Sequence, residues 1–493
     1  MAFNAAAAVL LGACSSGDAA SSGSASGSTA SPTAASAVAD YNEHAYEDLR
    51  DGGTFTSSGS FSGDDTQGLP WNVNASLTGA RLWAWYNPVA ITFSPSGAVQ
   101  INHDCYTDAA AEEVDGKQVV PITINPEAIY NDGTPIDWHS IEQTWKVNNG
   151  SASGDQIGDT AGWDQIESVE QGEDDRQAVV TFSEPYTAWP ALFSRFINPK
   201  AANVDAFNTA YSNQVQPDWG AGPFTIESYD SNSKRLVFTR NDKWWGKTAR
   251  LDKRIYVDLD SQAQVNAFKN GQIDYTATGT AEGLNEITGV AGTEIRQGGS
   301  PFVYSPFVNG KSDLLQDVDT RHAVLAAMDR AQIAQIEFQG LDYSEPLPGS
   351  AIYYSFQDGT RLSIDDTLFG DDALDKAVAQ SLVASFKKAG IELTIVSTDA
   401  SQWSSTINEG KFDLLLSANR SLDPYGSFGL AGFYGTGENN ITGVGSQELD
   451  DKIAAVNRIA DPDEQVVQAK RWSGRRSPST PCSRSSAVPR PME

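Results

Sequence analysis

The stretch RLDKRIYVDLDSQAQVNAFKNGQIDYT, residues 250–276, predicts a strand, a helix and a second strand in immediate succession. Ser261 is placed to cap the helix, and Gly271 is placed to end it. Val265 and Phe268 then share the helix face that turns inward. A strand that is joined to the next strand through a helix is the repeating unit of α/β layers, so this stretch decides the fold class.

The segments on both sides continue this mixture of strands and helices. TFTSSGSFS (54–62) alternates phenylalanine with polar residues and predicts a strand. Asp137 is placed to cap a helix whose Trp138, Ile141 and Trp145 share one face. The other predicted elements are hairpins in 163–193 and 219–246, a helical segment in 317–336, a helix and strand in 372–396, and a strand in 411–426 that runs into a Pro/Gly loop.

The composition excludes several classes of protein. The chain has 493 residues, 40% of them hydrophobic, which is room for about two to four domains with sizeable cores. Its net charge of -30 makes nucleic acid and anionic lipid head groups poor partners. Cys14, Cys105 and Cys482 are too far apart for a CxxC metal or redox motif. No apolar run of about 18 residues predicts a membrane-spanning helix.

The N-terminal segment resembles a bacterial lipoprotein signal. An apolar run leads into Leu-Gly-Ala-Cys, in which Cys14 would become the lipid-bearing N-terminus and residues 1–14 the signal peptide. Lys and Arg are missing before the apolar run, so we expect that the true start lies upstream or was lost. Residues 15–40 then form a Ser/Ala/Gly tether. The alternative is an incidental Ala-rich terminus with a buried cysteine.

No motif predicts a catalytic residue, a metal site or a cofactor. HExxH, GxSxG and GxGxxG are absent, and the four histidines lack metal-ligand spacing. The GKT and GKS triplets are not P-loop ends, because Asn241 and Ser305 stand where the first glycine is required. Carboxylates are abundant, so a secreted glycosidase remains an alternative. The aromatic runs LWAWY (82–86) and KWW (243–245) fit either sugar platforms or the walls of a core or pocket.

Six segments, taken in order, resemble the family 5 extracellular solute-binding proteins of peptide-type ABC importers, and actinobacterial members in particular. The resemblance runs from about residue 41 to residue 470. Its landmarks are YNDGTPIDWHSIEQTWK (130–146), GAGPFTIESYD (220–230), LVFTRNDKWWG (236–246), LDKRIYVDLDSQAQVNAFKNGQIDY (251–275), DTRHAVLAAMDRAQI (319–333) and FDLLLSANRSLDP (412–424).

The resemblance implies two α/β lobes around a cleft, the type II periplasmic-binding-protein-like fold. The first lobe would span residues 41–300, with an inserted subdomain at about 90–205, and the second would span 301–465. The implied protein is not an enzyme. It is a monomeric lipoprotein on the outer face of the cytoplasmic membrane, which captures peptides by hinge closure and delivers them to the permease subunits of an ABC transporter.

The resemblance also suggests which residues line the cleft: Trp83, Trp85, Tyr86, Asn309, Arg420, Asp423 and Tyr425. Arg420 stands where peptide binders of the family carry an aspartate that holds the amino group of the ligand. A cation cannot pair with an ammonium group, so Arg420 either meets a carboxylate or pairs with a neighbouring acid. A non-peptide solute, such as a sugar, a nickel complex or an opine, is therefore an alternative to a peptide.

Two segments depart from the family in length. Between Gln357 and Asp358 the chain is about forty residues shorter than relatives, which predicts a second lobe without one of its helices. Residues 471–493 are rich in Arg, Ser and Pro. We expect an out-of-frame tail, because loss of one G after the Lys470 codon turns a family-like AVEREALA frame into RWSGRRSP. The C-terminal return to the first lobe would then be missing; a genuine basic tail is the alternative.

Overall fold

The computed structural model describes most of the chain between residues 44 and 464. The described residues are 44–59, 69, 71–72, 75, 77–93, 99–154, 156–157, 160–277, 281–296, 303–337, 362–370, 373–399, 402–419, 436, 440–459, 461 and 464. Several predictions therefore lie outside the described residues. They concern residues 1–40 with Cys14, the junction at 357–358, Arg420, Asp423 and Tyr425, and the tail 471–493 with the missing C-terminal return.

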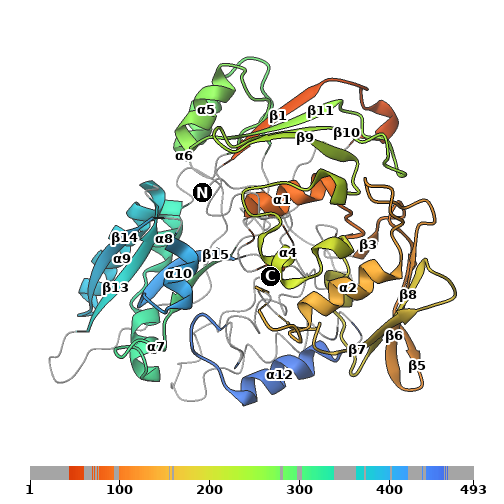
Figure 1. Ribbon diagram of the computed structural model, residues 1–493. Helices are drawn as coiled ribbons and strands as arrows, with labels where there is room; N and C mark the ends of the chain where they lie inside the picture. The colour runs from red at the N-terminus through yellow and green to blue at the C-terminus, as the bar shows by residue number, and fades with distance from the viewer. Residues whose placement is uncertain are drawn as a thin grey trace, which may run out of the picture.

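One four-stranded sheet, here called the N-terminal sheet, has the order β1-β11-β10-β9. The first two strands are parallel and the others antiparallel. Helix α1 packs against this sheet, since Trp85 meets Phe238 edge-on with 5.2 Å between ring centroids (Figure 1). The elements are β1 (Thr54–Gly59), β9 (Phe224–Asp230), β10 (Arg235–Arg240), β11 (Lys253–Asp258), α1 (Leu77–Tyr86), α4 (Val204–Thr209), α5 (Ser261–Lys269), α6 (Ala281–Ile287) and the 3-10 turns η1 (Tyr46–Asp48), η2 (Pro199–Ala201) and η3 (Pro217–Trp219).

A five-stranded antiparallel sheet, here called the middle sheet, follows the order β4-β6-β8-β7, and β5 also pairs with β6. Helix α2 lies across β7 and β8 and helps to bury a core that includes Trp163, Phe182 and Tyr186. The predicted hairpin of residues 163–193 is confirmed by the pairing of β7 with β8. The elements are β4 (Tyr106–Ala109), β5 (Glu112–Val114), β6 (Lys117–Ile124), β7 (Ile166–Gln171), β8 (Gln177–Phe182), α2 (Trp138–Asn148) and α3 (Trp189–Leu192). Ahead of them in the chain, β2 (Ile91–Phe93) and β3 (Val99–Ile101) form a separate antiparallel pair.

A third sheet, here called the C-terminal sheet, has the order β12-β15-β13-β14. β13 is parallel to β14, and β12 is antiparallel to β15. Helix α9 packs on this sheet and contributes Leu382 and Phe386 to a core of its own (Figure 1). The elements are β12 (Val303–Val308), β13 (Ser363–Phe369), β14 (Glu392–Thr398), β15 (Leu414–Asn419), α7 (Val318–Ala326), α8 (Arg330–Glu337), α9 (Ala373–Lys388) and α10 (Trp403–Asn408).

The segment 440–459, which contains α12 (Gln447–Asn457), joins the C-terminal sheet to the middle sheet. At one end, the backbone N–H of Gly310, just after β12, donates to the Thr442 carbonyl at 2.7 Å. At the other end, the Thr187 N–H, beyond β8, donates to the Asn457 carbonyl at 3.1 Å. Glu184 and Arg458 form an ion pair beside this contact. The late part of the chain is thereby attached to two regions far apart in sequence.

The mixed α/β prediction is confirmed, and so are several local predictions. Asp137 caps α2, because its carboxylate accepts a hydrogen bond from the His139 N–H at 3.0 Å. Gly271 follows α5 with a φ of +66°, the left-handed conformation that glycine adopts most easily. The hairpin predicted for 219–246 is formed by β9 and β10.

Three local predictions are wrong in detail. The cap of α5 is Asp260 rather than Ser261, since the Asp260 carboxylate accepts from the Ala263 N–H at 2.7 Å. The helical segment 317–336 is broken into α7 and α8, because Asp329 begins a new helix by accepting from the Gln332 N–H at 3.1 Å. The second strand of the opening stretch is reduced to a single bridge between Ser57 and Tyr275.

Candidate functional site

The predicted cleft residues of α1 differ in exposure. Trp83 is 0% exposed and Tyr86 is 5% exposed, and both belong to the core between α1 and the N-terminal sheet. Trp83 meets Tyr211 edge-on with 5.2 Å between ring centroids. Burial raises the pKa of the Tyr86 hydroxyl above its ordinary value. In this conformation both side chains pack in the core, and their contact with a solute stays a prediction.

Trp85 lies on another face of α1 and is only half-buried. The Arg254 guanidinium of β11 stacks on its indole ring, with Cζ 3.3 Å from the ring centroid. Arg254 was not among the residues predicted from the sequence. The sequence signal for it is weak, because Arg254 stands beside Lys253 and before the apolar run 255–257 rather than within it.

Asn309, directly after β12, is 0% exposed and holds two turns of the chain together. Its amide nitrogen donates to the carbonyls of Gly410 and Phe412 at 3.0 and 2.7 Å, and its oxygen accepts from the Lys311 N–H at 3.0 Å. These bonds position the start of β15. Arg420, Asp423 and Tyr425 follow that strand, outside the described residues, and stay predictions.

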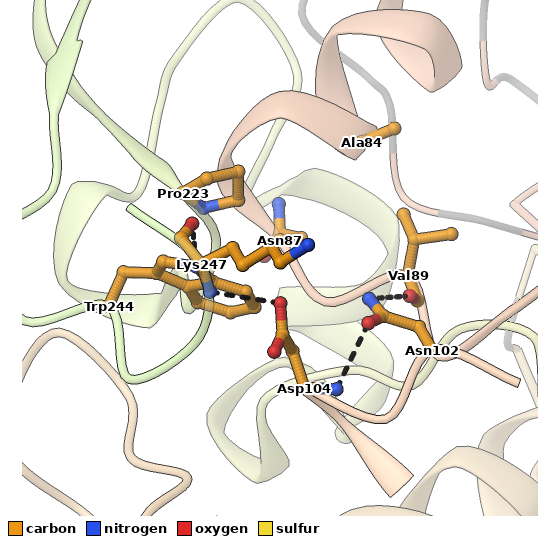
Figure 2. A pocket seen from close by; sticks show the side chains of 8 residues that line it. All are labelled: Ala84, Asn87, Val89, Asn102, Asp104, Pro223, Trp244 and Lys247. Atoms are coloured by element: carbon orange, nitrogen blue, oxygen red, sulfur yellow. Dashed lines mark hydrogen bonds between the residues drawn. The ribbon is translucent and has the colours of Figure 1, made fainter. Parts of the chain in front are cut away.

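A pocket of about 210 Å³ opens where the N-terminal and middle sheets meet, and we call it the junction pocket. Figure 2 shows the Trp244 ring along one wall and the carboxylate of Asp104 directed toward Lys247. The lining residues are Ala84, Asn87, Val89, Asn102, Asp104, Pro223, Trp244 and Lys247.

A chain of hydrogen bonds fixes the polar wall of the junction pocket. The Lys247 N–H donates to Asp104 Oδ2 at 3.0 Å, the Asp104 N–H donates to Asn102 Oδ1 at 3.1 Å, and Asn102 Nδ2 donates to the Val89 carbonyl at 2.9 Å (Figure 2). Gly246 is required there, because a Cβ would lie 2.5 Å from Asp104. The pocket is smaller than the about 300–1,000 Å³ typical of ligand sites, so it does not suit a peptide of several residues.

The C-terminal sheet contains a buried carboxylate that no sequence pattern indicated. Asp366 of β13 is 0% exposed, and neither carboxylate oxygen has a hydrogen-bond partner. Burial raises the pKa of Asp366 to about 7, and the negative charge of Asp375 on α9 adds to the rise. Asp413 nearby is satisfied, since it accepts from the Ser312 hydroxyl at 2.5 Å and from the Asp365 N–H at 3.1 Å.

The described part of the chain offers neither a metal centre nor a membrane span. No group of three or more His, Cys, Asp or Glu among the described residues is arranged to hold a metal ion. None of the helices in the described ranges has the length and apolar character that crossing a bilayer requires.

Comparison with known proteins assigns the family. A family model described as bacterial extracellular solute-binding proteins, family 5 middle, matches residues 106–361, which is more than half of the chain. The chain belongs to this family. The oligopeptide-binding protein OppA of Mycobacterium tuberculosis is 30% identical over 418 residues, which cover 76% of this chain and 70% of OppA.

Solved structures of the family 5 type have the same fold as this chain. The periplasmic EDTA-binding protein EppA superposes with a TM-score of 0.72 at 20% identity, covering 85% of this chain and 87% of EppA. The oligopeptide-binding protein AppA of Bacillus subtilis, solved with a nonapeptide, gives a TM-score of 0.68 at 14% identity, covering 85% and 90%. The two-lobe solute-binding fold predicted from the sequence is thereby confirmed. As a family 5 member, the protein is an extracellular solute-binding component of an ABC importer.

Proposed function

We propose that this family 5 protein captures peptides and delivers them to the permease of its importer. The observation that carries the proposal is the 30% identity to OppA, an oligopeptide-binding protein, over 418 residues. AppA, whose structure contains a nonapeptide, shares the fold with a TM-score of 0.68. The solute would lie in the cleft between the lobes, with Arg420, Asp423 and Tyr425 beyond β15 on one side and α1 on the other.

The chemistry of the cleft favours a solute with a carboxylate. Arg420 replaces an acidic side chain at a position where peptide-binding relatives hold an amino group, so recognition through the carboxylate end of a peptide is the expected mode. EppA, whose ligand EDTA is a polycarboxylate, has the same fold. A non-peptide carboxylate is therefore the second candidate.

Calorimetry of the full chain with a set of peptides tests the proposal. Peptides of three to nine alanines, each with a free and an amidated C-terminus, would be titrated, with EDTA as the non-peptide probe. We expect saturable binding of the free peptides. Binding of EDTA without binding of any peptide would instead favour the second candidate. Native mass spectrometry of the purified protein would reveal a co-purified solute by its mass.

We further propose that the protein is a monomer anchored through lipid on Cys14. The apolar run, the small residues before Cys14 and the Ser/Gly tether after it support this proposal. Expressed with a working signal sequence, the wild-type protein should partition with membranes, and Cys14→Ser should release it. Equal partition of both would contradict the anchor, and size-exclusion chromatography of the released form tests the monomer.

A further inference from the structure

Arg254 is the second residue of β11 and lies in an aromatic environment. Its guanidinium carbon is 3.3 Å from the ring centroid of Trp85, 5.7 Å from that of Phe224 and 6.0 Å from that of Phe55. Burial alone lowers the pKa of Arg254 to about 10, with no carboxylate among the causes. At neutral pH the group is therefore still charged, on a largely apolar surface.

Arg254 has no counter-ion among the described residues. Its buried Nε has no hydrogen-bond partner. Arg240, on the neighbouring strand β10, is different, because it pairs with Asp51 at 2.9 Å and Asp252 at 3.1 Å. Asp274 is close in the fold, but its carboxylate accepts a hydrogen bond from the Thr56 N–H at 2.7 Å. In a chain with a net charge of -30, an unpaired arginine is not explained by a shortage of acidic residues.

A second cation, Arg81, lies in the same place. It precedes Trp85 by one helical turn on α1, so the two side chains share a face of the helix. Burial raises the pKa of the Tyr275 hydroxyl, and the nearby positive charge of Arg81 opposes the rise. Tyr275 in turn approaches Phe55, with 6.5 Å between ring centroids. The ring contacts therefore run from Tyr275 through Phe55 to Arg254 and Trp85, and Arg81 is near enough to Tyr275 to act on its hydroxyl electrostatically.

The five residues Phe55, Arg81, Trp85, Arg254 and Tyr275 are all accessible to solvent. Tyr275 is 37% exposed, and Phe55, Arg81, Trp85 and Arg254 are each half-buried. Trp85 covers a face of the Arg254 guanidinium, which leaves the edge of the plane as the direction from which a ligand can accept hydrogen bonds. A carboxylate matches that edge in a planar, bidentate geometry, and the Tyr275 hydroxyl supplies another donor. The aromatic rings suit the organic group that carries the carboxylate.

We propose that Arg81, Arg254 and Tyr275, framed by Phe55 and Trp85, form a subsite on the N-terminal sheet that binds a carboxylate group of the captured solute. The subsite rests on the solute-binding function of the family and not on the solute being a peptide. It is separate from the junction pocket, and it is composed of residues from β1, α1, β11 and the segment after α5.

Nuclear magnetic resonance of the full chain labelled with 15N-arginine tests the subsite directly. Benzoate is the probe, and benzamide is its neutral match in shape. We expect saturable shifts of the Arg254 and Arg81 Nε–H signals with benzoate and none with benzamide. The signals are assigned from Arg254→Lys and Arg81→Lys. The absence of a saturable shift with benzoate, or the same shift with benzamide, would overturn the proposal.

Peptide affinity provides a second measurement. Arg254→Gln should weaken trialanine by about tenfold to a hundredfold and leave trialanine amide nearly unchanged, because the lost bond is charge-assisted. Arg235→Gln, on the exposed surface of β10, is the matched control and should change neither. Equal losses for both peptides in a variant with wild-type circular dichroism would overturn the subsite. If trialanine fails to bind the wild type while benzoate still shifts Arg254, the peptide proposal fails and the subsite stands.

Discussion

Replacing Asp366 by asparagine should stabilise the protein at neutral and alkaline pH. The folded chain raises the pKa of this buried carboxyl from the ordinary value of 3.8 to about 7. Between these two values the folded state holds a proton that the unfolded state has released, so stability falls as pH rises through this window. Above it, the buried charge costs on the order of 4 kcal/mol. Asparagine has nearly the same shape and never acquires the charge.

Urea unfolding of the full chain, followed by circular dichroism at pH 5 and pH 8, measures this effect. The stability advantage of Asp366→Asn over wild type should grow by about 2–3 kcal/mol between the two pH values. Asp365→Asn is the control, since Asp365 is the exposed neighbour on the same strand and should show no such growth. An advantage that is the same at both pH values would refute the reasoning. It would mean that Asp366 stays ionised in the fold or that it finds a partner.

Four further substitutions separate packing from binding. Trp83→Ala should lower the free energy of unfolding by about 3–5 kcal/mol and Trp85→Ala by less, because only Trp83 is fully buried; equal losses in urea would contradict this assignment. Asn309→Ala should cost about 1–3 kcal/mol through the two carbonyls that it leaves unpaired, and no loss in thermal unfolding would argue against it. Arg420→Ala should weaken a carboxylate-bearing ligand by about 1.5–3 kcal/mol, and unchanged affinity in calorimetry would remove Arg420 from the site.

The sequence predicts the fold where local chemistry and tertiary packing agree. Asp137 caps α2 as expected, because an aspartate before an amphipathic run has no competitor there. At α5 two adjacent residues can cap, and Asp260 takes the place predicted for Ser261. The break between α7 and α8 falls at Asp329, inside a segment with continuous helical propensity. Pattern alone does not decide between a mid-helix aspartate and a cap, because an aspartate side chain can form local bonds to the backbone that compete with a continuous helix.

The site was harder to predict than the fold, for a related reason. LWAWY (82–86) presents three aromatic residues, and nothing in the sequence states which of them faces the core. The helix turns Trp83 and Tyr86 inward and leaves Trp85 half-buried against Arg254. That contact joins residues far apart in sequence, from a helix and a strand that meet only in the folded sheet. The burial of Asp366 is likewise not predictable from the sequence, because an aspartate in an alternating strand normally indicates a solvent-facing position.

Arg254, which is half-buried, and Asp366, which is fully buried, are both ionisable groups without a counter-ion among the described residues, yet only Arg254 points to a ligand. Asp366 is fully enclosed, and its pKa is about 7. It can therefore bind a proton and become neutral, which avoids the free-energy cost of a buried charge without any ligand. Arg254 cannot become neutral in this way, because a pKa of about 10 leaves it charged at any physiological pH. It also stays partly exposed, beside Arg81 and the hydroxyl of Tyr275. A permanent, accessible cation without a counter-ion among the described residues offers a favourable partner for an anion, which a carboxylate-bearing solute would supply.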